Sequence, residues 1–168
     1  MRYAGFLALL VASIGAFAAQ PSYSPPTEFR GHQWGKKFTD FPEMTSVTKD
    51  GATALYSLNG DELAIGDATL NALLYGFYDD QFFTVFIPFS GNSNARAILQ
   101  ALEAKYGKGS QQNRYIPRYM WGTTTTVTIL YNYSDVSKEG SVTYAYRPIA
   151  EKRASAARST AERARDQL

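Results

Sequence analysis

The chain has 168 residues, a formal net charge of +2 at pH 7 and no cysteine. The absence of cysteine excludes disulfides, thiol chemistry and cysteine metal ligands. The near balance of acidic and basic residues is untypical of a dedicated nucleic-acid binder, so we expect no nucleic-acid partner. Twelve Tyr, ten Phe and two Trp predict an aromatic core built on a sheet.

Residues 1–19 have the features of a cleavable signal peptide. Arg2 supplies a positive charge, residues 3–16 are apolar or small and uncharged, and residues 16–18 read Ala-Phe-Ala, a small-residue cleavage pattern. The run is shorter than the about 20 predominantly apolar residues that a spanning helix needs. We therefore expect cleavage after residue 18 or 19, a periplasmic or secreted protein, and no membrane span in the mature chain.

The mature chain divides into three parts. Residues 20–28 are rich in Pro and Ser, which predicts an extended, disordered tether, with ordered structure beginning near Phe29. Residues 29–148 carry the patterns of a single domain, whose size is that of one ordinary domain. Residues 149–168 are rich in Ala, Arg and Glu and predict a C-terminal helix or tail. The large apolar residues of this helix are Ile149 and Leu168, so we expect it to dock weakly.

Short segments of alternating polarity in the domain predict an antiparallel sheet. In residues 81–89, the apolar residues at odd positions from Phe83 to Phe89 are expected to face the core. Phe82 and Phe86 make the opposite face apolar as well. Asp50-Gly51 is a preferred two-residue turn. Strands are expected at residues 47–49, 52–58, 63–65, 70–78, 81–89, 123–133 and 141–147.

Residues 94–106 predict the clearest helix. Ser93 or Asn94 is suited to cap its start, and Gly107 to end it. Because the strands and helices do not alternate, the fold class is α+β: an antiparallel sheet of about five to seven strands, one amphipathic helix packed on a face, and a C-terminal Ala/Arg-rich helix. The apolar stripe of the amphipathic helix consists of Ala95, Ile98, Leu99, Leu102 and Tyr106.

The sequence holds few residues suited to catalysis or metal binding. His32 is the sole histidine. The G-x-S-x-G nucleophile motif, phosphate-binding loops and the calcium-loop spacing do not occur, and the acidic residues near Asp61 are typical of turns. We expect no metal, no cofactor and no catalytic constellation. The favoured function is a non-enzymatic binding module, and the alternative is a small hydrolase that uses His32 or a pair of carboxylates.

The most distinctive segment is residues 113–121, which read Asn-Arg-Tyr-Ile-Pro-Arg-Tyr-Met-Trp. Tyr, Trp and Arg dominate interaction hot spots, and rings stack on the apolar faces of ligands. The partner would be a protein, a peptide or a glycan of the cell envelope. The competing interpretation makes the rings plugs of the core, with the arginines extending to water. The candidate ligand-binding residues are Arg114, Tyr115, Arg118, Tyr119 and Trp121.

A spaced pattern of aromatic residues and glycines runs through the domain. It consists of Phe29-x-Gly31-x-x-Trp34-Gly35, then Tyr75-Gly-Phe-Tyr-Asp-Asp, then Lys105-Tyr106-Gly107, then Trp121 before a Thr-rich strand. On this pattern, most of residues 29–147 resemble small exported proteobacterial proteins of unknown function. The resemblance implies a bacterial envelope protein, without a known activity or catalytic residues. The segment from Ile149 onward lies outside it.

Overall fold

The structure, a computed structural model, describes residues 22–165; the expected signal peptide and Leu168 lie outside the described residues. Within this range, seven strands form one antiparallel sheet in the order β3-β4-β7-β8-β11-β10-β9. The α+β class with one packed helix and a C-terminal helix is thus confirmed. The sheet consists of β3 (Met44–Asp50), β4 (Thr53–Leu58), β7 (Leu74–Tyr78), β8 (Gln81–Ser90), β11 (Glu139–Tyr146), β10 (Val127–Tyr133) and β9 (Arg118–Trp121).

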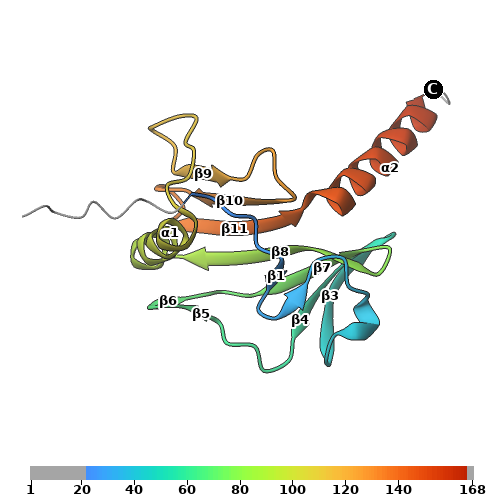
Figure 1. Cartoon of the computed structure of the whole chain (residues 1–168), viewed down its shortest axis with the longest axis horizontal. Helices are drawn as coiled ribbons and strands as arrows, with labels where there is room; N and C mark the ends of the chain where they lie inside the picture. Colours follow the sequence, from blue (N-terminus) through green and yellow to red (C-terminus); the bar gives the residue numbers. More distant parts are fainter. Residues whose placement is uncertain (1–21, 166–168) are drawn as a thin grey trace, which may run out of the picture.

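Smaller elements lie beside this sheet (Figure 1). They include two short antiparallel hairpins, a single 3-10 turn and the two helices. The hairpins are β1 (Glu28–Phe29) with β2 (His32–Gln33), and β5 (Ala64–Ile65) with β6 (Ala68–Thr69). The remaining elements are η1 (Phe38–Asp40), α1 (Asn92–Tyr106) and α2 (Arg147–Arg165).

One face of the sheet, called the covered face, carries the core. Helix α1 packs on part of this face, and the N-terminal segment with its aromatic rings packs on the rest. Trp34 stacks on Phe82 with ring centroids 4.7 Å apart, and Phe41 contacts the same ring edge-on at 5.2 Å. Alternate residues of β10, from Val127 to Tyr133, are buried there, as their spacing in the sequence predicted. The core is therefore aromatic and mostly sheet-derived.

Helix α1 begins two residues earlier than expected. Its N-cap is Gly91, with φ of 91°, and no side chain caps the start, so the prediction of a Ser93 or Asn94 cap is wrong. The Asn94 side chain instead bonds to the Ser90 carbonyl and to the Thr69 N–H, tying the helix to β6. The expected end at Gly107 is confirmed, since the N–H of Gly107 donates to the Glu103 carbonyl.

A β-bulge changes which phenylalanine of β8 faces the core. Gly76 pairs with Thr84 and Phe77 pairs with Phe82, so Phe83 is the extra residue between them. Phe82 is consequently in the aromatic cluster of the covered face. Phe83 is also buried, but it lines a depression on the other face together with Ala150 of α2. The expectation that Phe83 shares the core face with Val85 is therefore wrong, because a bulge shifts the alternation by one residue.

The domain extends further toward the N-terminus than the expected start near Phe29. Tyr23, in the segment expected to be a tether, packs its ring 5.8 Å from that of Tyr106. Its hydroxyl donates a 2.6 Å hydrogen bond to the Val127 carbonyl. The expectation of a disordered tether is therefore wrong at Tyr23, because its ring and hydroxyl fix this extended chain against the domain.

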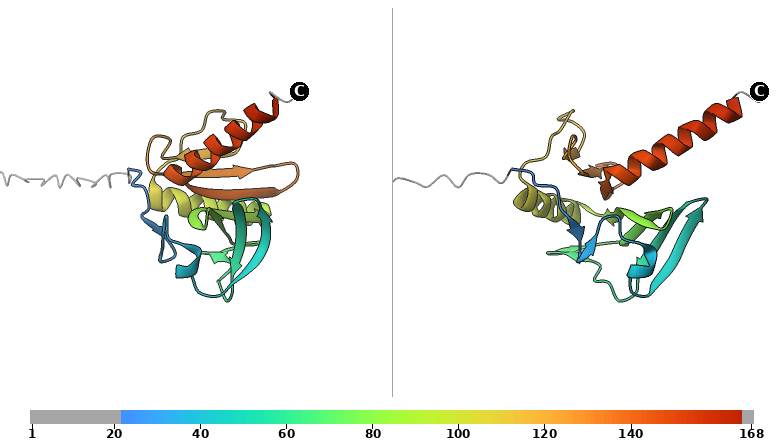
Figure 2. Two further views of the ribbon diagram at one scale, coloured as in Figure 1. Left: turned by 90° about the vertical axis from the view of Figure 1, so that its right-hand side faces the viewer. Right: turned by 45° about the vertical axis from the view of Figure 1, so that its right-hand side comes forward.

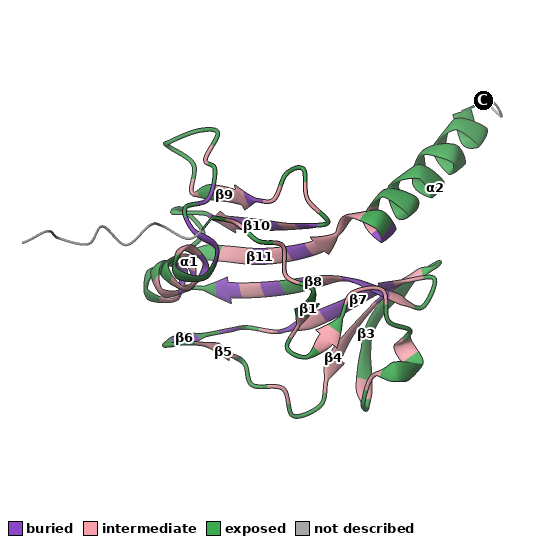
Figure 3. Cartoon of the chain, in the orientation of Figure 1, coloured by how far each residue is buried: buried purple, intermediate pink, exposed green. Residues whose placement is uncertain are grey.

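Helix α2 projects away from the sheet at the end of β11, as Figures 1 and 2 show. Ile149 in its first turn is buried, whereas residues 151–165 are exposed (Figure 3). Lys152 forms a 2.7 Å ion pair with Asp79, and the Arg153 Nε donates to the Thr53 hydroxyl at 3.1 Å. No helix among residues 22–165 has the length and apolar character to cross a membrane.

Candidate functional site

Strand β9 divides the predicted site residues between the two faces of the sheet. Trp121 pairs with Ile129 and Tyr119 pairs with Tyr131, so both rings point to the covered face. Trp121 is 3% exposed, and its indole Nε1 donates to the Gly107 carbonyl at 2.7 Å. Trp121 is thus a core residue, as the competing interpretation of this segment predicted, and not part of an exposed binding surface. Tyr119 is half-buried against Tyr131 and does not complete an exposed aromatic platform.

Arg114 and Tyr115 lie in the exposed loop that connects α1 to β9 (Figure 3). The guanidinium carbon of Arg114 lies 4.7 Å from the centroid of the Tyr115 ring, and the guanidinium also donates to the Tyr115 hydroxyl. The Arg114 guanidinium is therefore engaged by the ring and the hydroxyl of Tyr115. Of the five predicted residues, Arg118 is the one that the structure places in a hollow of the surface.

The face opposite the core, called the open face, carries two rows of side chains that cross neighbouring strands. Antiparallel register sets them directly opposite one another, so each row is continuous across β9, β10, β11 and β8. The first row is polar with a proline at its end, and the second is mostly apolar. The first consists of Arg118, Asn132, Ser141 and Pro88, and the second of Met120, Leu130, Thr143 and Phe86.

A larger and a smaller hollow lie along these rows, and together they are called the groove. The larger hollow has a volume of about 550 Å³, and the smaller one about 210 Å³. Arg118 and Ile116 line both hollows. The larger is also lined by Phe86, Pro88, Asn132, Glu139 and Ser141, and the smaller by Gln112, Thr123, Met120 and Leu130.

The loop before β9 forms the outer wall of the smaller hollow. Ser110 bridges to Met120 through two backbone hydrogen bonds of 2.8 and 2.9 Å, which cover the outer edge of β9. The Gln111 side chain donates to the Ile116 carbonyl at 2.9 Å and closes the loop on itself. Ile116 is consequently held over the groove by backbone contacts, although its side chain is 49% exposed.

Two large apolar side chains that are exposed to solvent line the same hollow of the groove. Phe86, 36% exposed, and Ile116 line the larger hollow. A local concentration of exposed apolar area is typical of interaction sites, whereas singly scattered apolar residues are not.

Arg118 is the positive charge of the groove. Its Nε donates to the Asn132 Oδ1 at 2.6 Å, across the β9–β10 pair. Within residues 22–165, the ion pairs are Arg30–Asp61, Arg147–Glu151 and Lys152–Asp79, and Arg118 belongs to none of them. The guanidinium is therefore held in place by a neutral amide and takes part in no ion pair within this range.

His32 is placed by ring packing. Its imidazole stacks on Phe41 at 4.6 Å and meets the edge of the Tyr75 ring at 5.8 Å. Among residues 22–165 it forms no hydrogen bond or ion pair with a carboxylate. The geometry thus gives His32 no partner that would orient it as a general base.

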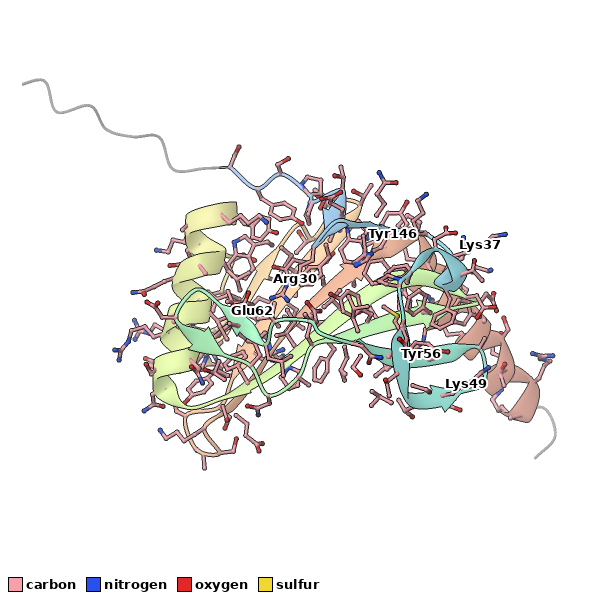
Figure 4. All side chains as sticks on the ribbon, turned by 90° about the horizontal axis from the view of Figure 1, so that it is seen from below. Arg30, Lys37, Lys49, Tyr56, Glu62 and Tyr146 are labelled. Carbon is pink, nitrogen blue, oxygen red and sulfur yellow. The ribbon has the colours of Figure 1, made fainter. Side chains whose placement is uncertain are left out.

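Asp61, one of the acidic residues considered for chemistry, is occupied by structural bonds. Its carboxylate accepts a 2.6 Å hydrogen bond from the Tyr75 hydroxyl and forms a 2.6 Å ion pair with Arg30. Arg30 also donates to the Glu62 carbonyl, and Figure 4 shows the two residues side by side. Burial raises the pKa of the Tyr75 hydroxyl, and its bond to Asp61 raises this pKa further. No group of three or more possible metal ligands occurs in residues 22–165.

Sequence reasoning missed most of the residues that line the groove with Arg118. Asn132, Leu130 and Ser141 alternate with buried residues of β10 and β11, so the same period that predicted the core also places them on the opposite face. What the period could not indicate is which of these positions stand opposite Arg118, because register between distant strands is a tertiary property.

Comparison of the chain with models of protein families, with curated proteins and with solved structures found no match.

Proposed function

We propose that the protein is an exported, non-enzymatic interaction module of the bacterial envelope that binds a protein or peptide segment in the groove of its open face. One observation carries this proposal: exposed Phe86 and Ile116 line one hollow of about 550 Å³ together with Arg118, which takes part in no ion pair within residues 22–165. Export is inferred from the charged, apolar and Ala-Phe-Ala features of residues 1–19.

The lining favours a peptide over a glycan. A glycan ligand would need exposed ring faces on which sugars stack, yet Trp121 is buried and Tyr115 is already stacked by Arg114. The groove instead offers aliphatic and phenyl surface from Ile116 and Phe86 beside amide and hydroxyl groups. Such a mixture suits a polypeptide, which presents apolar side chains and backbone hydrogen-bonding groups together.

The hydrolase alternative lacks supporting geometry among the described residues. His32 packs between rings rather than beside an acid, and Asp61 is engaged by Arg30 and Tyr75. Glu139 lines the larger hollow. Hydrolysis by a pair of carboxylates would need a second acid beside it, and the other lining residues include none. A binding role therefore fits the residues of the groove better than hydrolysis does.

A selection experiment tests the interaction function. Random heptapeptides displayed on phage are selected on the immobilised protein, and the affinities of enriched peptides are measured by fluorescence anisotropy. We expect the double variant Phe86→Ser, Ile116→Ser to bind these peptides at least about tenfold more weakly, because it removes the apolar centre of the groove.

The matched control is the double variant Val47→Ser, Leu63→Ser, which removes two exposed apolar side chains from other parts of the surface. It should bind the selected peptides with unchanged affinity. Equal binding by both double variants, or failure of any peptide to enrich, would overturn the proposed function.

A further inference from the structure

We infer that the groove selects peptide segments in which a carboxylate lies two positions from an apolar side chain, and that Arg118 binds this carboxylate. The inference depends on the proposed interaction function and adds the chemical class of the ligand. It assigns separate tasks to the two rows of the open face: charge recognition to the row of Arg118, and apolar contact to the row of Met120 and Leu130.

The guanidinium of Arg118 is positioned and still has unused donors. The 2.6 Å bond from Nε to Asn132 fixes the plane of the group. The two terminal nitrogens form no hydrogen bond with any residue of the described range 22–165. A planar pair of N–H donors matches the two oxygens of a carboxylate, which makes such pairs stronger and more selective than neutral hydrogen bonds.

Three other arginines differ from Arg118 in their partners or in their position. Arg30 is neutralised by Asp61, and Arg147 by Glu151. Arg114 covers the Tyr115 ring and lies outside the residues that line either hollow. Arg118 differs from these three because it lines the groove, donates its Nε to a neutral amide and takes part in no ion pair within residues 22–165. Arg153 likewise forms no ion pair there, but it donates to Thr53 and lines other hollows.

The spacing of the rows indicates where the apolar side chain of the ligand lies. Arg118 and Met120 are two residues apart on β9, which corresponds to about 7 Å along a strand. An extended peptide that lies along β9 and β10 presents its own side chains i and i+2 at the same spacing. A carboxylate at Arg118 therefore places the side chain two positions away against Met120, Leu130 and Ile116, which line the smaller hollow.

A carboxylate in the larger hollow limits the charge of the ligand. Glu139 lines this hollow together with Arg118 and takes part in no ion pair within residues 22–165. A second negative group on the ligand would be repelled there. The groove thus favours a segment with one carboxylate at Arg118 and neutral or basic groups toward Glu139.

Two short peptides test the assignment directly. N-acetyl-Asp-Ala-Leu amide and N-acetyl-Asn-Ala-Leu amide differ by the charge and one atom of a single side chain. Each is titrated into ¹⁵N-labelled protein while the Arg118 Nε–Hε resonance and the β9 and β10 amides are followed by NMR. We expect the Asp peptide to shift these resonances and to bind roughly tenfold or more tightly than the Asn peptide. Raising the salt from about 50 to 500 mM should reduce this advantage.

Two arginine variants separate recognition from general charge. Arg118→Gln should abolish the preference for the Asp peptide, whereas Arg114→Gln, a matched exposed arginine four residues away, should retain it. Both side chains are exposed, so both variants should fold, and thermal melting checks this. Equal binding of the Asp and Asn peptides to the wild-type protein, or an unchanged preference in Arg118→Gln, would overturn the role of Arg118.

The failure of this inference can be told apart from failure of the proposed function. If neither peptide shifts any groove resonance, the ligand class is wrong. The interaction function is then decided by the phage selection, whose readout depends on Phe86 and Ile116 and not on Arg118. Selected peptides that lose affinity in the Phe86→Ser, Ile116→Ser variant but carry no acid would keep the function and refute the carboxylate.

Discussion

Removal of the Trp121 ring should be among the most damaging single changes in the domain. The side chain is 3% exposed, and its Nε1 donates to the Gly107 carbonyl at 2.7 Å. Truncation of a buried Trp to Ala costs about 3–5 kcal/mol. It also leaves the Gly107 carbonyl without its donor, so we expect a loss near the upper end of this range. For a domain of about 150 residues this corresponds to a decrease in Tm of roughly 8–20 °C.

Urea unfolding followed by circular dichroism measures this loss. Trp34 remains as the fluorophore in Trp121→Ala, so fluorescence would report a different part of the core. Trp121→Phe keeps most of the apolar volume but removes the indole donor and part of the ring, and should lose about 1–3 kcal/mol. The double variant Arg114→Ala, Arg118→Ala changes exposed positions of the same segment and should leave Tm nearly unchanged.

A double-mutant cycle with Gly109 provides an independent check. A Cβ atom on Gly109 would lie 2.7 Å from the Trp121 ring, which is closer than real contacts allow. Gly109→Ala should therefore destabilise the wild-type protein but cost much less in the Trp121→Ala background, where the ring is gone. A loss below about 1 kcal/mol for Trp121→Ala, or equal costs of Gly109→Ala in both backgrounds, would refute the placement of this ring in the core.

Three further outcomes are expected. Deletion of residues 155–168 should lower Tm by only a few degrees, because residues 151–165 are exposed; loss of folding in circular dichroism would show that the helix is a core element. Asp61→Ala should lower the urea-derived unfolding free energy by about 1–3 kcal/mol, since Tyr75 and Arg30 lose their shared acceptor. Glu62→Ala should leave this free energy nearly unchanged, because Arg30 bonds only to the backbone carbonyl of Glu62. Equal losses in Asp61→Ala and Glu62→Ala would contradict the structural role of the Asp61 carboxylate. Burial raises the pKa of Tyr75 and Tyr131 in the folded state, so the unfolded chain loses phenolic protons first. Stability should therefore be complete below about pH 9 and fall above about pH 10, and urea midpoints that stay constant up to about pH 11 would contradict this.

The sequence by itself determined the elements whose signal is local. The spacing of Ala95, Ile98, Leu102 and Tyr106 indicated helix α1, because one turn of a helix returns every third or fourth residue to the same face. The alternation from Val127 to Tyr133 indicated β10 and its buried face. Gly107 marked the end of α1, because glycine adopts the positive φ of 75° found there without strain. These features depend on residues within a few positions of one another.

Only the tertiary structure decided which residues meet. The bulge at Phe83 depends on the pairing of β8 with β7. It places Phe82, rather than Phe83, in the aromatic cluster of the covered face. Arg118 and Trp121 belong to one distinctive segment, yet the pleat of β9 directs the indole into the core and the guanidinium into the groove. Asn132, which orients Arg118, is fourteen residues away. Register between such strands is set by the packing of the whole sheet, so the groove could not be read from local pattern.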